Sequence, residues 1–376
     1  MDASHAADIL SSDARSGARA LLLDHMGVER GSRVLLLCHP PLAGFANAVA
    51  DVARGEGIDC EVGGSNVDFE SIEPTLGRFD TVVYLERPGG TASDFPRGTH
   101  MREATGWLKS TPAPRTRVFR VFDSSRELLE ECFRVPRAEL QRLNDALIAR
   151  AWRTSEIRVT SEAGTDLTVK LDRRYKWTNS CSVFPGRRPG IVPPSEVSTF
   201  SEHVDGVLVA DGAINCNMTC DVDDPRLAGR PVRVEIADGR ATSMQCDDDR
   251  IAEFLGAFFA MENTRRGPLG TGEFYATENA RRVGEVGLGT NVGIRRFVPM
   301  VSFINERVPT LHLGFGAHLQ PPGLAYTCHV HLDLILDRCE IAFDGETVLR
   351  DGRYLVEETA APQDLGEIPM IPADSF

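Results

Sequence analysis

The hydrophobic pattern of this 376-residue chain changes its period near residue 150, and this change limits the folds that the chain can adopt. Before that point, short apolar runs alternate with segments of helical spacing. The runs are suited to strands buried on both faces: Arg33–Cys38, Thr81–Leu85 and Arg117–Phe122. Residues 5–26, with Gly27 as a stop, and residues 43–55 are predicted to be helices. This alternation predicts a parallel α/β domain over residues 1–152.

A predicted helix at 137–152 leads into a second half whose apolar residues alternate with period two. The alternating runs are Ser155–Ser161, Val204–Ala210, Val232–Ile236 and Cys339–Phe343. Four Asp-Gly pairs predict tight hairpin turns, at 211–212, 238–239, 344–345 and 351–352. A helix is predicted at 251–261, and residues 185–194 are expected to be a surface loop that leads to Ser195-Glu196-Val197. Residues 153–376 therefore predict a mostly antiparallel β domain, and the fold class is α/β (α+β overall).

Composition excludes several classes of partner. The net charge of −14 opposes nucleic-acid binding, which needs basic surface. No apolar run approaches the roughly 20 residues of a membrane-spanning helix. The N-terminal residues lack the basic start and apolar stretch of a signal peptide, so a cytoplasmic location is expected. Nine scattered cysteines predict reduced thiols rather than a disulfide framework.

A histidine-rich stretch near the C-terminus is the strongest chemical signal. It contains four of the nine histidines, namely His312, His318, His329 and His331. In an extended segment His331 and Asp333 point to one face, and an imidazole beside a carboxylate suits a divalent transition metal. Glu285 lies between glycines in an apolar run, where a carboxylate is costly unless it is paired or binds metal. Taken alone, Glu196 and Glu306 are more typical of solvated loop carboxylates.

Four motifs in order resemble those of a known family. They are Pro194-Ser-Glu196-Val-Ser-Thr199, Gly284-Glu285-Val-Gly-Leu-Gly-Thr-Asn291, Thr310-Leu-His312-Leu-Gly-Phe-Gly316 and His331-Leu-Asp333. With these motifs, the chain from Ile157 to Leu336 resembles the aminopeptidase T / aminopeptidase S family of metallopeptidases. The segment Gly31–Leu36 is also similar to the α/β domain of that family.

The resemblance implies a cytoplasmic, homodimeric metallohydrolase that cleaves an amide or peptide bond of a small or N-terminal aminoacyl substrate. It implies two divalent ions (zinc, cobalt or manganese), with Glu285 as the bridge. The implied ligands are Glu196, Glu285, His312, His331 and Asp333. Two such ions can polarise a carbonyl and activate water. Glu196, His318 and Tyr326 are the candidates for catalytic roles, and His329 is a further candidate beside the metals.

One departure from the peptidases supports an alternative. The peptidases carry a tyrosine seven residues after the third-motif histidine, where this chain has Leu319 and only Tyr326 nearby as a substitute. The segment Thr327–Asp333 also resembles the 2,5-dihydroxypyridine dioxygenases, which hold one Fe(II) with two histidines and a carboxylate and carry a histidine near the position of Glu285. The presence of Glu196, Glu285 and His312 favours the hydrolase. A relative that only binds a metal or a partner is a third possibility.

Overall fold

A computed structural model of the chain defines its fold. It describes residues 10–65, 69–88, 100–111, 115–181, 189–217, 222–260, 265–266, 275–276, 279–321, 323, 325–326, 328, 330–356, 368 and 370. The chain folds into two compact units, and the helix at 137–152 belongs almost entirely to the second. Whether residues 1–152 and 153–376 are independent domains stays a prediction.

Unit 1 is built on a parallel sheet with the strand order β2-β1-β3-β4-β8. The strands are β1 (Arg33–Cys38), β2 (Asp59–Gly64), β3 (Thr81–Leu85), β4 (Arg117–Val121) and β8 (Pro189–Val192). The helices are α1 (Ser12–Ala20), the π-helix η2 (Leu21–His25), the 3-10 helix η3 (Pro40–Leu42), α2 (Ala43–Gly55), α3 (Phe69–Leu76), α4 (His100–Ser110) and α5 (Arg126–Glu131). Leu35, Leu37 and Val82 pack with residues of α3 and α4 in one apolar cluster. The predicted parallel α/β arrangement is confirmed.

Two predictions for unit 1 need correction. The described part of the first helix begins at Ser12, because Ser11 caps it by accepting a hydrogen bond from the backbone N–H of Ala14 at 3.1 Å. The π-helix η2 continues α1 to His25, so the helical run stops before Gly27, which has a φ of +61°. The expected surface loop is wrong for residues 189–192, which form β8 and pair with β4. Proline at the start of this segment and the prolines that follow it favour a loop in a sequence-based prediction. The first residue of an edge strand nevertheless tolerates proline.

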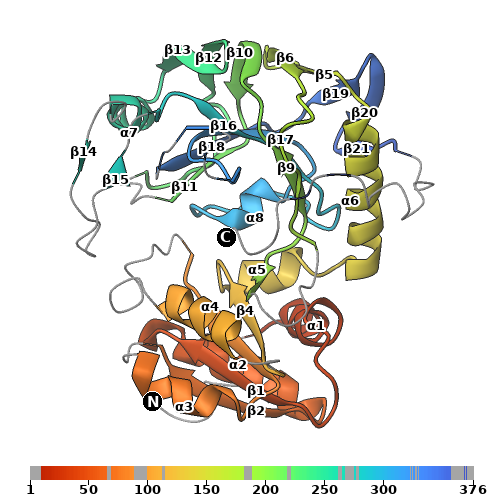
Figure 1. Ribbon diagram of the computed structural model, residues 1–376, viewed down its shortest axis with the longest axis vertical. Helices are drawn as coiled ribbons and strands as arrows, with labels where there is room; N and C mark the ends of the chain where they lie inside the picture. The colour runs from red at the N-terminus through yellow and green to blue at the C-terminus, as the bar shows by residue number, and fades with distance from the viewer. Residues whose placement is uncertain are drawn as a thin grey trace. The chain divides into compact units, whose positions relative to one another are not determined.

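Unit 2 contains two antiparallel sheets (Figure 1). The eight-stranded sheet has the order β13-β12-β10-β6-β5-β19-β20-β21, with β5 (Glu156–Thr160), β6 (Asp166–Lys170), β10 (His203–Ala210), β12 (Val232–Ala237), β13 (Arg240–Cys246), β19 (Glu340–Phe343), β20 (Glu346–Arg350) and β21 (Arg353–Tyr354). The six-stranded sheet has the order β11-β18-β17-β16-β9-β7, with β7 (Thr178–Asn179), β9 (Glu196–Thr199), β11 (Ala213–Cys216), β16 (Val283–Gly289), β17 (Leu311–Gly316) and β18 (His331–Ile335). Three helices, α6 (Arg137–Trp152), α7 (Asp249–Ala260) and α8 (Phe303–Glu306), and the short pair β14 (Arg265–Arg266) and β15 (Tyr275–Ala276) complete it. The antiparallel prediction is confirmed.

Three of the four Asp-Gly pairs form the predicted hairpin turns. The pairs at 238–239, 344–345 and 351–352 have positive φ at both residues, which suits a type I′ turn. They connect β12 to β13, β19 to β20 and β20 to β21. The prediction is wrong for 211–212, because β10 and β11 belong to different sheets. That pair therefore carries the chain from one sheet to the other.

The six-stranded sheet has one apolar and one polar face. Alternate residues such as Val286, Leu313 and Leu334 enter a single buried core, to which the eight-stranded sheet, α6 and α7 also contribute. The residues between them include the predicted metal ligands, so the period of two sends these ligands to the opposite face.

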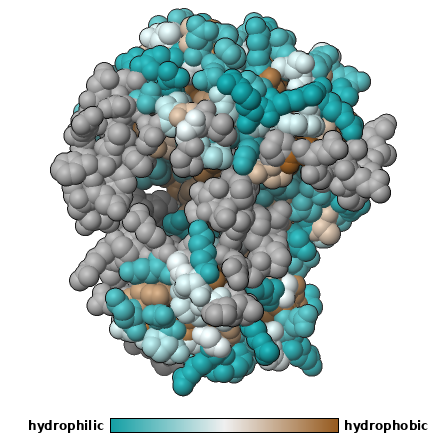
Figure 2. Space-filling view, viewed as in Figure 1, coloured by the Kyte–Doolittle hydropathy of each residue, from teal (hydrophilic) through white to brown (hydrophobic). Residues whose placement is uncertain are grey.

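The described surface is mainly hydrophilic on the face drawn in Figure 2. Among described residues, the large hydrophobic side chains that are exposed are Val292 and Leu355. None of the helices in the described part of the chain is long and apolar enough to cross a membrane. The described cysteines are free thiols, as predicted.

Candidate metal centre

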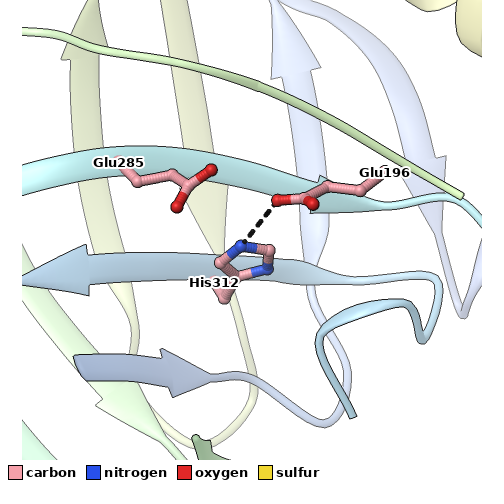
Figure 3. Close-up of side chains that lie close together, drawn as sticks. All are labelled: Glu196, Glu285 and His312. Carbon is pink, nitrogen blue, oxygen red and sulfur yellow. Dashed lines mark ion pairs between the residues drawn. The ribbon is translucent and has the colours of Figure 1, made fainter. Parts of the chain in front are cut away.

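Four neighbouring strands carry the five predicted ligands. Glu196 begins β9, Glu285 lies on β16, His312 on β17, and His331 and Asp333 on β18. These strands are adjacent in the order β18-β17-β16-β9. Residues more than 100 positions apart in the sequence therefore lie together on the polar face of one sheet. Figure 3 shows the side chains of Glu196, Glu285 and His312 pointing toward one another.

The five side chains form two clusters that share one carboxylate. Glu196, Glu285 and His312 place one ligand atom each within 4.8 Å of one another, and so do Glu285, His331 and Asp333. In the first cluster, Nε2 of His312 lies 3.2 Å from Oε1 of Glu196. In the second, Nε2 of His331 lies 3.1 Å from Oε2 of Glu285 and 3.0 Å from Oδ1 of Asp333. The shared residue, Glu285, is the one that the family resemblance implies as a bridge.

Glycines opposite the ligands make room for them. In the strand pairing, Gly287 faces His312, and Gly314 faces both Glu285 and Asp333. A Cβ atom at Gly287 would lie 2.0 Å from Nε2 of His312. A Cβ atom at Gly314 would lie 2.6 Å from Cε1 of His331 and 2.9 Å from Cβ of Glu285. The imidazoles thus occupy space that a cross-strand side chain would normally fill.

Hydrogen bonding orients His331 for a metal ion, whereas the ring nitrogens of the buried His312 lack aligned hydrogen bonds. Nδ1 of His331 donates to the backbone carbonyl of Ala317 at 3.0 Å, which directs Nε2 toward the carboxylates. Metal-binding histidines usually have such a backbone partner. His312 and Asp333 are fully buried, and none of their side-chain nitrogen and oxygen atoms makes an aligned hydrogen bond, although ion-pair distances are short. Buried polar atoms without such bonds are costly, so this donor set fits a divalent ion.

A buried group beside the clusters was missed by sequence reasoning. Arg307 pairs with Oε2 of Glu196 and lies 3.2 Å from Oε2 of Glu306. Glu306 also accepts a hydrogen bond from the side-chain amide of Asn215 on β11. The expectation that Glu196 and Glu306 are solvated when taken alone is wrong, since they are only 6% and 5% exposed. The run Asn305-Glu306-Arg307 shortly before His312 is the feature of the sequence that could have indicated this buried group. A short charged run by itself, however, does not indicate burial.

The pKa shifts follow from burial and close charges. Burial raises the pKa of Glu196, but Arg307 and His312 outweigh it and the net shift is downward. Burial lowers the pKa of His331, yet Asp333 and Glu285 raise it well above its usual range. Burial and the neighbouring Asp333 raise the pKa of Glu306 well above normal. Without bound cations, the carboxylates here depend for charge compensation on Arg307 and on the protons held by His331 and Glu306.

The other predicted functional residues make local contacts. Nδ1 of His318 accepts a hydrogen bond from the backbone N–H of Gln320 at 3.1 Å, and its Nε2 contacts the carbonyl of Tyr326. The hydroxyl of Tyr326 donates to the carbonyl of Gly316 at 2.7 Å. Neither residue belongs to the two clusters found in the described part of the chain. Their catalytic roles stay predictions, and His329 lies outside the described residues.

Comparison with known proteins identifies the family. The family model for 2,5-dihydroxypyridine 5,6-dioxygenase (NicX) matches residues 103–291, half of the chain. The chain belongs to the NicX family. This confirms the predicted relationship, which included the relatives of this dioxygenase. No curated protein sequence matches the chain.

Two solved structures resemble most of the chain of this NicX family member. The structure of 2,5-dihydroxypyridine dioxygenase from Pseudomonas putida KT2440 has a TM-score of 0.58 and 16% identity, and covers 92% of this chain and 98% of that one. Wild-type AmpT from Thermus thermophilus has a TM-score of 0.56 and 15% identity, and covers 92% of this chain and 99% of that one. At these identities the likeness establishes a shared fold.

Proposed function

We propose that this protein is a metal-dependent hydrolase that cleaves an amide bond of a small or N-terminal aminoacyl substrate. Two divalent ions, zinc, cobalt or manganese, would be held on the polar face of the six-stranded sheet. Glu196 and His312 would hold one ion, and His331 and Asp333 the other, with Glu285 between them. The single observation that carries this proposal is that the two clusters share Glu285.

The composition of each cluster favours a hydrolase over an oxygenase. Each described cluster offers one imidazole and two carboxylates. Non-haem iron oxygenases use two imidazoles and one carboxylate on one face of the ion. Dinuclear hydrolases instead need two ion positions that share a bridging ligand. The two ions polarise the substrate carbonyl and lower the pKa of bound water. The two described clusters, with Glu285 in common, support the second arrangement.

Charge and exposure suggest how the residues of the two clusters differ in role. Burial raises the pKa of Glu196, but Arg307 and His312 lower it by more, so the net shift is downward. The carboxylate therefore stays ionised, and it suits the role of a metal ligand better than that of a general base. The side chains of Glu285 and His331 are 12% and 22% exposed, whereas those of His312 and Asp333 are 1% exposed. A substrate would therefore approach from the side of Glu285 and His331. We retain the homodimer, the cytoplasmic location and a small-molecule or peptide substrate as parts of this proposal.

A second candidate is a ring-cleaving dioxygenase with one Fe(II). The match of residues 103–291 to the 2,5-dihydroxypyridine 5,6-dioxygenase family supports it. In that case Glu285, His331 and Asp333 would hold the iron, because that cluster is the more open one.

Metal analysis combined with a substrate panel separates the two candidates. The protein is purified without added metal, and its metal content is measured before and after dialysis against Zn²⁺, Co²⁺, Mn²⁺ or, without oxygen, Fe²⁺. Aminoacyl-nitroanilides, small cyclic amides and 2,5-dihydroxypyridine are then tested while oxygen consumption is recorded. The hydrolase predicts two ions per chain and amide cleavage without oxygen uptake. One iron per chain with oxygen uptake on dihydroxypyridine would support the dioxygenase, and binding of no ion would contradict both.

A further inference from the structure

Arg307 is a fully buried cation that touches the candidate metal centre without being one of its ligands. Its side chain is 5% exposed and pairs with Oε2 of Glu196. The other oxygen of that carboxylate, Oε1, lies 3.2 Å from Nε2 of His312. The guanidinium therefore engages one oxygen of Glu196 and leaves the other directed into the first cluster.

The arginine is itself held from several directions. It follows α8 directly, and its backbone carbonyl accepts a hydrogen bond from the N–H of Asn291 at 2.9 Å. Its guanidinium lies 5.9 Å from the ring centre of Phe303 and 3.2 Å from Oε2 of Glu306. Asn215, which is paired with Asp333 between β11 and β18, donates to the other oxygen of Glu306. A chain of contacts thus runs from β11 through Glu306 and Arg307 to Glu196.

We propose that Arg307 is a positioning residue that fixes Glu196 as a ligand through one oxygen, an inference that rests on the metal-dependent function proposed above. A planar guanidinium can hold two carboxylates in one orientation, which a lysine ammonium does less well. Arg307 contacts Glu306 as well as Glu196, so the guanidinium is held in place beside the first cluster at two points. Groups that orient a metal ligand in this way commonly change metal affinity by 10–100-fold when they are replaced.

A competing explanation makes the opposite prediction. The guanidinium of Arg307 could take the place of a cation at Glu196, so that the protein would hold a single ion. Replacing Arg307 by a neutral side chain would then create a second ion position. Under the positioning role, the same replacement weakens one of two positions that already exist.

Cobalt titration of four proteins decides the question: wild type, Arg307→Met, Arg307→Lys and the control Arg230→Met. Arg230 pairs with Asp248 at 3.0 Å, outside both clusters. Stoichiometry and affinity are measured by calorimetry and by the visible spectrum of bound Co²⁺. We expect two ions in the wild type and the control, and about 10–100-fold weaker binding of one ion in Arg307→Met, with a changed spectrum. Arg307→Lys should weaken the same ion less.

The other outcomes contradict either the positioning role of Arg307 or the proposed function. Two ions bound by Arg307→Met with wild-type affinity and spectrum would overturn the positioning role and leave the proposed function intact. One ion in the wild type and two in Arg307→Met would show that the guanidinium replaces a cation, which also overturns it. No ion in the wild type would overturn the proposed function itself. If Arg307→Met does not fold by circular dichroism, the affinity of Arg307→Lys decides alone, and wild-type affinity there overturns the role.

Discussion

The imidazole of His312 fills the space directly opposite Gly287, where a Cβ atom would lie 2.0 Å from Nε2. The backbone of β16 and β17 is paired on both sides of this point, so neither strand can move away freely. The candidate metal centre therefore depends on Gly287, which contributes no ligand atom.

Gly287→Ala should displace His312 and weaken the ion held by Glu196 and His312. Forcing a methyl group into this space should also lower the free energy of unfolding by about 1–3 kcal/mol. Metal titration and denaturant unfolding measure the two effects. The control is Gly256→Ala on α7, where an added Cβ meets nothing within 4 Å. That control should keep its metal affinity and gain up to about 1 kcal/mol from helix propensity. Unchanged metal binding in Gly287→Ala would contradict the account of the glycine.

Glu285→Gln should weaken both ions, because Glu285 belongs to both clusters. His312→Ala should weaken only the ion at the first cluster, since His312 belongs to that cluster alone. The metal content of each variant after dialysis against a fixed concentration of free Zn²⁺ measures the difference. The idea of a shared carboxylate fails if Glu285→Gln loses one ion and keeps the other at wild-type affinity.

Asn144→Ala should destabilise the protein through the start of β9. The fully buried amide of Asn144 accepts a hydrogen bond from the hydroxyl of Ser195 at 3.0 Å and donates to Oδ1 of Asn179 at 2.9 Å and to the carbonyl of Glu196 at 3.3 Å. Loss of this amide leaves buried partners unsatisfied, at a cost of about 1–3 kcal/mol. Denaturant unfolding gives the value. Gln141→Ala on the same helix, which removes a partly exposed bond to Asp145, should cost less than about 1 kcal/mol.

Acidification should destabilise the protein through His25 in unit 1. Burial lowers the pKa of His25 to about 4, with a further contribution from Arg137, while Asp24 and the backbone of Val135 oppose the shift. The usual value is 6.5, so below that pH the unfolded chain takes up a proton that the folded chain refuses until about pH 4. Stability is thus lost as the pH falls through this window, by about 2 kcal/mol between pH 7 and pH 5.

His25→Gln tests this directly. The variant lacks the titrating group, so its free energy of unfolding should fall by about 2 kcal/mol less than that of the wild type over the same pH range. Denaturant unfolding at pH 7, 6 and 5 provides the comparison. Equal losses in the two proteins would show that His25 is not the group responsible.

The sequence predicts local structure well wherever the period is clear. The strands Arg33–Cys38 and Thr81–Leu85 and the helix 137–152 have the predicted bounds, because their apolar spacing coincides with burial. The strand at Pro189–Val192 was missed, since its pairing with β4 comes from tertiary structure and its prolines point to a loop. The predicted hairpin turn at 211–212 is wrong for a similar reason. An Asp-Gly pair does not indicate which sheet the next strand joins.

The candidate site shows the same division. Resemblance to a family predicted five ligands, and the strand order brings all five together in two clusters. Arg307 and Asn215 were not predicted, because their contacts depend on the path of the chain around α8 and β11. The glycines at 287 and 314 were visible in the motifs, but their purpose depends on the strand register.

The sharing of Glu285 places the two candidate chemistries one substitution apart. A histidine there would give the more open cluster two imidazoles and one carboxylate, and would remove the carboxylate from between the two ion positions. That substitution would give this cluster the donor set that mononuclear iron sites use, on the same strands. Residue 285 is therefore the position at which protein engineering could exchange one donor set for the other.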